Sequence, residues 1–290
     1  MTPRLGFTFV PGFPPSALRP IATATEAVGL DELWVWEDCF KESGIASAAL
    51  ALGATERIAV GIGLMPTPLR NVALTAMELA TIEGAIPDRL IGGIGHGVLP
   101  WMAQVGGRVA SPVTLLREYA AALRPLLGGQ RVTVDGRYVH LDDVALDWPP
   151  ARRVPVLIGA GGPKGVRLSG ELADGLIIAG GRSRAQVTQA RGWAREGGAD
   201  ADAPVIVSLM VALGDDAAQR LTADLAVFGD AGAPEEAAVT GTAEQVAERV
   251  LAYAAAGATT VTFQPTLDEQ DVEGLLGFLG EEVAPLVRGA

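Results

Sequence analysis

Two glycine-rich turns, each containing a cation, are the segments of this chain best suited to bind an anion. The stretches GAGGPKG (residues 159–165) and AGGRS (residues 179–183) each lie between an apolar run and a helical pattern. Such a turn exposes unpaired N–H groups at the positive end of a helix dipole, and both features favour a phosphate. Lys164 and Arg182 add full charges, so the two turns predict a phosphate site. The alternative is that the glycines only allow tight turns.

A third glycine-rich segment combines a histidine with large apolar side chains. In GGIGHGVLPWM (residues 92–102), four glycines let a flat group approach the backbone, and His96 offers a ring N–H. A turn histidine that faces solvent is the alternative. Trp101 and Met102 follow, either as packing at a helix start or as one wall of a substrate pocket.

The segment WEDCF (residues 36–40) supplies two acids and the single cysteine. Consecutive side chains of an extended chain point to opposite sides, so only one of Glu37 and Asp38 faces a cavity. Cys39 is either a reactive thiol or a small buried apolar residue. With one cysteine and two histidines in the whole chain, the sequence predicts neither a disulfide framework nor a metal centre.

These segments follow strand-like runs that alternate with helical patterns along the whole chain. The runs are apolar at consecutive positions, which is typical of strands covered by helices on both faces. Eight such units predict a closed (β/α)₈ TIM barrel, in which functional groups gather at the carboxyl ends of the strands. The predicted strands are residues 5–10, 32–36, 58–64, 90–95, 154–160, 175–179, 205–213 and 259–264.

The helical patterns fill the intervals, with one interruption. They cover residues 15–28, 45–54, 72–86, 112–127, 163–173, 184–196, 216–228, 243–256 and 272–287. Residues 129–148 break the alternation and predict a surface β-hairpin, inserted between the fourth helix and the fifth strand, with Asp135 and Gly136 at its turn. We expect one domain over residues 1–290. The alternative is two doubly wound halves divided near Pro149 and Pro150, where no long polar linker is present.

Composition excludes several classes of function. Hydrophobic residues make up 49% of the chain and charged residues 19%, which is typical of a globular protein with a large core. A net charge of −12 opposes binding to nucleic acid or to an anionic membrane surface. No run reaches the roughly 20 apolar residues that span a bilayer, and the first residues lack a signal-peptide pattern. We therefore expect a cytoplasmic protein that acts on a small molecule.

The order and spacing of three long stretches resemble a known family. They are RIAVGIGLMPTPLRNVALTAMELATIEGAIPDRLIGGIGHG (residues 57–97), residues 111–150 with SPVTLLREYAAALRPLLGG and VDGRYVHLDDVALDWPP, and VPVLIGAGGPKGVRLSGELADGLIIAGG (residues 154–181). The chain resembles the bacterial luciferase-like superfamily of flavin- and deazaflavin-dependent oxidoreductases, which are (β/α)₈ barrels. It is most similar to the branch that uses coenzyme F420.

The resemblance implies roles for individual residues. Asp38 and His96 match positions that contact the cofactor, and Gly63 and Leu64 match a non-proline cis peptide that backs the cofactor ring. Two turns match the phosphate side of the cofactor, at Gly161, Gly162, Pro163, Lys164, Gly180 and Gly181. The anion site expected from the residues themselves and the one implied by the family therefore coincide.

Departures from the family bear on the substrate. The sugar-phosphate dehydrogenases of this branch carry a histidine and a glutamate where this chain has Cys39 and Val98, and an alcohol cannot lose its proton without a base. The first predicted rim also lacks the acid of the methylenetetrahydromethanopterin reductases. The remaining pocket candidates are apolar and predict an apolar or aromatic substrate; they are Phe9, Phe13, Trp36, Met65 and Trp101.

Three functions remain open from the sequence. The first is hydride transfer between bound F420 and an organic substrate, with Asp38, Cys39 and His96 as the catalytic candidates. The second keeps the fold but uses FMN and oxygen, as a monooxygenase. The third is a barrel that binds the cofactor without catalysis. By resemblance we also expect a homodimer, for which the alanine-rich residues 46–54 would suit a helix interface.

Overall fold

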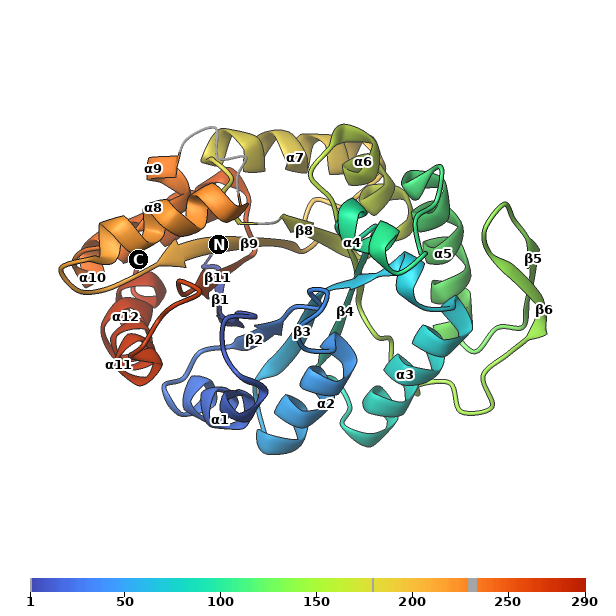
Figure 1. Ribbon diagram of the computed structural model, residues 1–290, viewed down its shortest axis with the longest axis horizontal. Helices are drawn as coiled ribbons and strands as arrows, with labels where there is room; N and C mark the ends of the chain where they lie inside the picture. The colour runs from blue at the N-terminus through green and yellow to red at the C-terminus, as the bar shows by residue number, and fades with distance from the viewer. Residues whose placement is uncertain (1, 179, 229–233) are drawn as a thin grey trace.

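The computed structural model describes residues 2–178, 180–228 and 234–290, and these form a closed ring of parallel strands surrounded by helices (Figure 1). Neighbouring strands pair in chain order, and β11 pairs with both β9 and β1, while β8 pairs with β9. The predicted (β/α)₈ barrel is therefore confirmed. Its strands are β1 (Arg4–Phe9), β2 (Glu32–Val35), β3 (Ala59–Pro66), β4 (Leu90–Gly95), β7 (Val156–Gly159), β8 (Gly175–Ile178), β9 (Val205–Val211) and β11 (Thr260–Gln264).

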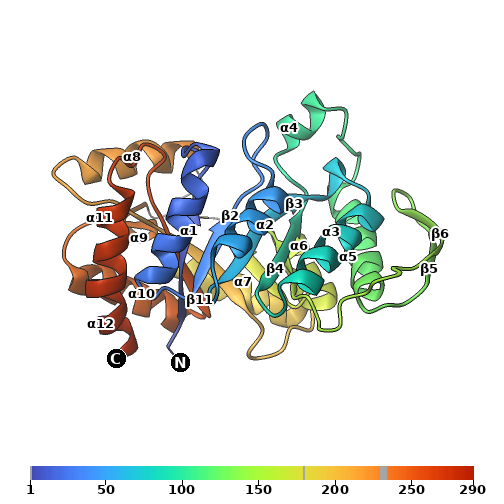
Figure 2. The ribbon, with the colours of Figure 1, turned by 90° about the horizontal axis from the view of Figure 1, so that it is seen from below.

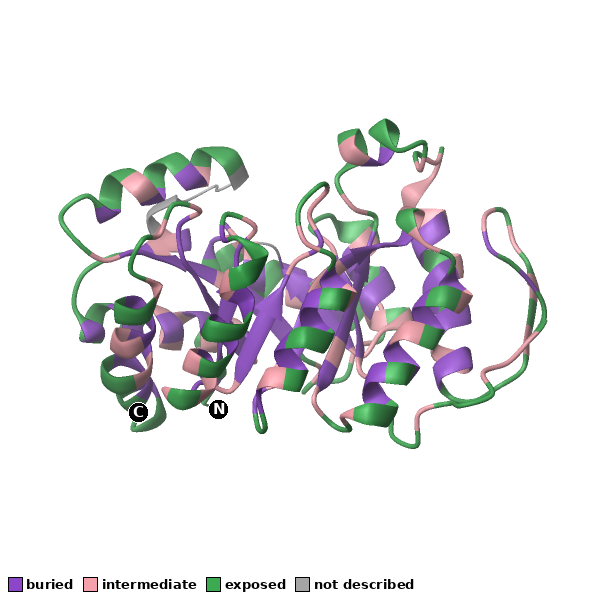
Figure 3. Ribbon diagram, turned by 60° about the horizontal axis from the view of Figure 1, so that its bottom comes forward, coloured by how far each residue is buried: buried purple, intermediate pink, exposed green. Residues whose placement is uncertain are grey.

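Amphipathic helices cover the outside of the barrel. In α1, for example, Leu18, Ile21, Ala22 and Thr25 recur at helical spacing and are all buried. Figure 3 shows the same division, with buried strands and helices whose outer faces are exposed. The helices are α1 (Leu18–Ala27), α2 (Gly44–Ala54), α3 (Val72–Ala85), α5 (Pro112–Leu127), α6 (Pro163–Leu172), α7 (Arg184–Glu196), α10 (Ala243–Ala256), α11 (Val272–Gly277) and α12 (Ala284–Arg288). A π-helical segment, Phe278–Val283, joins the last two, where the sequence predicted one continuous helix.

Further elements lie on the side to which the strands run. These are α4 (Leu99–Gln104), α8 (Ala217–Phe228), α9 (Pro234–Ala237) and β10 (Ala238–Val239), which pairs with β9. Only α8 was predicted from the sequence. Figure 2 shows α4 and α8 at the end of the barrel away from both chain termini.

The inserted hairpin lies in the segment where the sequence predicts it, at the outer edge of the molecule (Figure 1). Its strands β5 (Val132–Asp135) and β6 (His140–Val144) are antiparallel. The connection is longer than the expected Asp-Gly turn, because four residues, 136–139, separate the strands. The carboxylate of Glu118 in α5 accepts hydrogen bonds from the N–H groups of Arg137, Tyr138 and Val139, at 2.9, 2.8 and 3.1 Å. A helix side chain thus fixes the connection.

Large side chains close the amino end of the barrel interior. Trp34 packs with Leu157, Ile177 and Ile206, which come from strands on the other side of the ring, and we call these four residues the Trp34 plug. The indole Nε1 donates to the Glu32 carboxylate at 2.7 Å, and Arg4 also pairs with that carboxylate. A ligand must therefore enter from the carboxyl ends of the strands, which we call the mouth. Among the described residues, no helix has the length and apolar character needed to cross a bilayer.

Candidate functional site

The turn that follows β7 presents an open helix start at the mouth. Gly162 is the N-cap of α6 and makes no side-chain capping bond, and Pro163 begins the helix. Residues 161–164 are all exposed. Since the first N–H groups of a helix have no acceptor within it, those of Lys164 and Gly165 remain available to an anion. The structure thus places the predicted phosphate turn where a ligand can reach it.

The turn that follows β8 has a different role. The Ser183 hydroxyl accepts from the Gln186 N–H, and the Gln186 side chain accepts from the Ser183 N–H. The Glu236 carboxylate accepts from the Arg184 N–H at 2.9 Å. The N–H groups of Ser183, Arg184 and Gln186 at the start of α7 are therefore already occupied, in contrast to the open start of α6. The expectation that both turns offer an open helix start needs this correction.

This second turn instead contributes a side chain to the first. The Arg182 Nη2 lies 3.0 Å from the position that a Cβ on Gly161 would occupy, so the guanidinium lies against the glycine backbone. Gly181 has a φ of +79°, a conformation that suits glycine. Together, Arg182, Lys164 and the start of α6 form a candidate anion site, which we call the anion-binding corner, in a chain of net charge −12.

A bulge in β3 shapes the part of the mouth next to this corner. The Gly63–Leu64 peptide is cis, as the family resemblance implies, and the pairing of β3 with β4 shifts register between Ile62 and Met65. A Cβ on Gly95 or Gly159 would lie 2.5 or 2.1 Å from the Leu64 Cδ2. The Leu64 side chain therefore lies directly over two glycines, and this explains why the ends of β4 and β7 carry no side chains there.

The two consecutive acids after β2 have separate surroundings. The Glu37 carboxylate accepts from the Gly44 N–H at 2.8 Å and forms a two-point ion pair with Arg70, at 2.6 and 3.1 Å. Glu37 is 9% exposed and joins the start of α2 to the loop after β3. Burial raises the pKa of Asp38 to about 6, with a smaller contribution from Glu42, while Lys41 acts in the opposite direction. The pKa of Asp38 thus lies closer to neutral pH than the ordinary value of an aspartic acid.

The other two catalytic candidates lie at the same rim. Burial, followed by the charges of Glu37 and Asp38, raises the pKa of the Cys39 thiol above its usual value, so the thiol stays protonated at neutral pH. His96 is exposed, and its Nδ1 lies 2.6 Å from the Gly97 carbonyl oxygen. Because a carbonyl only accepts, Nδ1 donates this bond, which leaves Nε2 as an acceptor when the ring is neutral.

The five predicted pocket residues divide into two groups. Phe9, Phe13 and Met65 are 2%, 6% and 1% exposed and belong to the main core, where the two phenyl rings meet edge to face at 5.7 Å. Trp36 and Trp101 are partly exposed. We therefore assign the first three to packing and keep only the two tryptophans as candidates for the substrate pocket.

The structure reveals polar groups inside the barrel that sequence reasoning missed. The hydroxyls of Thr8, Thr262 and Ser208 form a chain across β1, β11 and β9, with oxygen separations of 3.2 Å. Gln264, at the end of β11, is 1% exposed, and neither of its amide atoms has a hydrogen-bond partner among the described residues. The available signal was a polar residue within each of these three strands and, for Gln264, at the end of β11.

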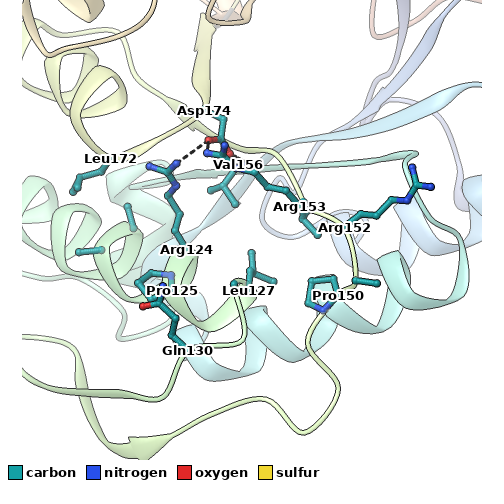
Figure 4. Close-up of a pocket in the computed structure, with 15 residues that line it drawn as sticks. Arg124, Pro125, Leu127, Gln130, Pro150, Arg152, Arg153, Val156, Leu172 and Asp174 are labelled. Carbon is teal, nitrogen blue, oxygen red and sulfur yellow. Dashed lines mark hydrogen bonds and ion pairs between the residues drawn. The ribbon is translucent and has the colours of Figure 1, made fainter.

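A cavity at the other end of the barrel has a different character. About 680 Å³ in volume, it lies between α5, α6 and the start of β7 (Figure 4). Asp174 forms ion pairs there with Arg124 and Arg153 and accepts from the Val156 N–H at 2.8 Å. These charges satisfy one another at the amino end of the strands, a face associated with stability in this fold. We do not place the active site there.

Comparisons with known proteins identify the family and the fold of the chain. A family model described as luciferase-like monooxygenase matches residues 5–231. The 5,10-methylenetetrahydromethanopterin reductase of Methanolobus tindarius is 31% identical over 174 residues, which is 60% of this chain and 53% of that protein. The F420-dependent glucose-6-phosphate dehydrogenase of Tsukamurella paurometabola is 34% identical over 211 residues, which is 66% of this chain and 62% of that protein. The matches thus span between half and two thirds of these relatives.

Solved structures share the fold. The coenzyme F420-dependent tetrahydromethanopterin reductase of Methanopyrus kandleri superposes with a TM-score of 0.84 at 19% identity, covering 98% of this chain and 99% of that one. An F420-dependent secondary alcohol dehydrogenase, solved with an F420-acetone adduct, gives a TM-score of 0.86 at 22% identity, covering 99% and 100%. Because the family model covers most of the sequence and the barrel is the same, this chain belongs to the luciferase-like monooxygenase family.

Proposed function

We propose that this protein is an oxidoreductase that binds the deazaflavin coenzyme F420 and uses it to exchange hydride with a small organic substrate. The observation that carries the proposal is the anion-binding corner at the mouth, where Arg182 and Lys164 lie beside the open start of α6. Relatives whose names specify F420 support the choice of cofactor. When bound, the deazaflavin supplies the redox chemistry, and the protein supplies position and charge.

The mouth fits such a cofactor in two respects. An anionic tail would meet the N–H groups of Lys164 and Gly165 and the two cations, where the protein offers positive potential. A planar ring would lie against Leu64, which covers the glycine ends of β4 and β7. Trp36, beside Gly63, offers a further apolar surface. The end of β7 and the turn after it thus join the ring side, at Gly159, to the phosphate side, at the start of α6.

Asp38 is the residue we propose for proton exchange. A carboxyl group whose pKa is about 6 has both of its forms populated near neutral pH, so it can donate or accept a proton there. Cys39 and His96 remain neighbouring candidates. With Trp36 and Trp101 partly exposed, we propose a substrate whose body is apolar or aromatic.

We also propose that the protein is a homodimer. Leu50 of α2 is 65% exposed, and Leu74 and Met77 of α3 are 45% and 56% exposed. Helices α2 and α3 are neighbours (Figure 1), and apolar side chains on adjacent helices form a surface suited to a second copy of the chain.

Titration of the purified protein tests the cofactor. We expect oxidised F420 to bind at micromolar concentration, followed by its fluorescence, and to bind more tightly than FMN. Arg182→Gln should weaken binding about tenfold, because it removes a charge-assisted contact. Arg195→Gln is the matched control, since Arg195 is an exposed arginine in the last turn of α7.

Each contrary result is informative. A preference for FMN would favour the monooxygenase alternative over the proposal. Failure to bind either cofactor would refute both. Equal losses in the Arg182 and Arg195 variants would show that the anion-binding corner does not hold the tail.

A further inference from the structure

The side chain of Gln264 is buried without partners. It is 1% exposed, and neither Nε2 nor Oε1 has a hydrogen-bond partner among the residues that the structure describes. Exchanging the two atoms by rotating the amide changes nothing, because both lack partners. Leaving a buried donor and acceptor unpaired costs free energy, so native proteins rarely keep such groups without a ligand or ordered water.

This amide lies inside the barrel, next to the turn after β8. A Cβ on Gly180 would be 2.8 Å from the Gln264 Oε1 and 3.5 Å from the Ser208 Cβ. The absence of a side chain at Gly180 thus leaves the amide and the serine beside each other. Gln264 and Met210 are register partners, and Thr262 and Ser208 form the pair below them.

Solvent reaches the interior at this level. Ser208 lies two residues beyond Ile206 on the same face of β9, and Ile206 belongs to the Trp34 plug. Ser208 therefore points inward as well, yet it is partly exposed. The barrel interior above the plug is therefore open to solvent at Ser208, and we call this space the hollow. The Gln264 amide lies beside it and is itself covered, since the residue is 1% exposed.

The hydroxyl chain makes this part of the hollow polar but uncharged. Thr8 donates to Thr262 and Thr262 donates to Ser208, so the Ser208 hydroxyl retains its own proton for a further acceptor. A planar partner that carries a donor and an acceptor side by side would satisfy both atoms of Gln264 at once. A carboxylate would satisfy Nε2 and place negative charge against Oε1.

We propose that Gln264 and Ser208 form a hydrogen-bonding subsite for a cis-amide edge, as found in a lactam or an imide. This goes beyond the proposed function, because it does not depend on which redox cofactor binds. Two sources share the chemistry: the pyrimidinedione ring of a flavin or deazaflavin, and a lactam group on the substrate. Either would enter through the mouth.

The test compares succinimide with N-methylsuccinimide, which lacks the N–H donor. Binding is measured by NMR titration of the intact protein, with and without F420. We expect the cofactor-free protein to bind succinimide at least tenfold more tightly, and Gln264→Leu to lose this preference. Gln219→Leu is the control, since Gln219 is exposed on α8. Thermal unfolding of both variants confirms that they fold.

The cofactor distinguishes the two sources. If the ring occupies the subsite, Gln264→Leu weakens F420 binding about tenfold and the loaded protein does not bind succinimide. If the substrate occupies it, F420 affinity is unchanged and the loaded protein still prefers succinimide. Equal binding of the two imides by the cofactor-free protein, or a preference that survives in Gln264→Leu, overturns the proposal and leaves water as the partner. A protein that prefers succinimide but binds no F420 would refute the proposed function alone.

Discussion

At the residue scale, two neighbouring carboxyl groups differ in their chemistry because their surroundings differ. Glu37 is held by Arg70 and the Gly44 N–H, which satisfy its charge and make it structural. Burial of Asp38 disfavours its ionised form, and the pKa of its carboxyl is accordingly raised to about 6. Groups with a perturbed pKa are concentrated at functional sites, because acid and base catalysis requires a pKa matched to the reaction.

Asp38→Asn should stabilise the protein at neutral pH. The folded state binds the Asp38 proton more tightly than the unfolded state, since the pKa rises from 3.8 to about 6 on folding. The contribution of the Asp38 carboxyl to the free energy of unfolding is therefore fully present below pH 3.8, and it is lost as the pH rises through about 6. Removing the charge should gain about 1–2 kcal/mol at pH 7.5, allowing for partial exposure. Urea unfolding of both proteins measures the gain.

The pH dependence provides the control for this variant. At pH 4 the wild-type carboxyl is already protonated in the folded state, so Asp38→Asn should change stability little. A gain of the same size at pH 4 and pH 7.5 would contradict a role for the buried charge. If Asp38 also exchanges the substrate proton, the variant loses the change in turnover near pH 6.

At the element scale, the ends of strands and the starts of helices build the mouth. The start of α6 is open and that of α7 is capped by its own Ser183, so we propose the turn before α6 as the one that receives an anion through its backbone. The bulge in β3 places Leu64 over the glycines of β4 and β7. Neither feature belongs to a single residue, because each depends on how two elements meet.

Gly159→Ala should force Leu64 out of its position. A methyl group there would lie 2.1 Å from the Leu64 Cδ2, which is far below a van der Waals contact. We expect a loss of about 1–3 kcal/mol in unfolding free energy. Leu64→Ala in the same chain should restore part of this loss, with a coupling of at least about 1 kcal/mol in a double-mutant cycle.

A matched glycine provides the control. Gly192 lies in α7, and apart from its chain neighbours and the backbone of its own helix no described heavy atom lies within 4 Å of its Cβ position. Gly192→Ala should therefore stabilise the helix instead. Additive effects of the Gly159 and Leu64 changes would show that the leucine does not cover the glycine.

At the scale of the whole molecule, the barrel is closed while one outer face remains apolar. Pairing of β8 with β9 and of β11 with β1 completes the ring and leaves the mouth as the route to the hollow above the Trp34 plug. The exposed Leu50, Leu74 and Met77 lie outside the ring, on α2 and α3. They contribute nothing to the core, so an interface with a second chain is the physical reason we propose for their exposure.

Charges placed on this face should separate the dimer. We expect wild-type protein to sediment at twice the 29.9 kDa mass of the chain. Leu50→Glu combined with Met77→Glu should give monomers, because a new interface would bury two unpaired carboxylates. Leu286→Glu on α12, where the leucine is 41% exposed, should leave the dimer intact. Wild-type protein that sediments as a monomer at all concentrations would refute the interface.

The sequence by itself determined the repeating architecture and much of the predicted rim. Consecutive apolar residues located all eight barrel strands, and Pro163 after a glycine turn located the start of α6. These features depend on local backbone preference and on periodic burial, which neighbouring residues record directly. Residues 136–139 show the limit of such signals, because Glu118 from α5 sets the form of the hairpin connection.

Only the tertiary structure decided which side chains meet. It assigned Phe9 to the core, gave Glu37 its partner Arg70, brought Arg182 to Gly161, and left Gln264 without a partner among the described residues. Each outcome depends on contacts between residues far apart in the chain. The burial of a polar group and the pKa of a carboxyl are properties of such contacts, so local sequence patterns do not contain them.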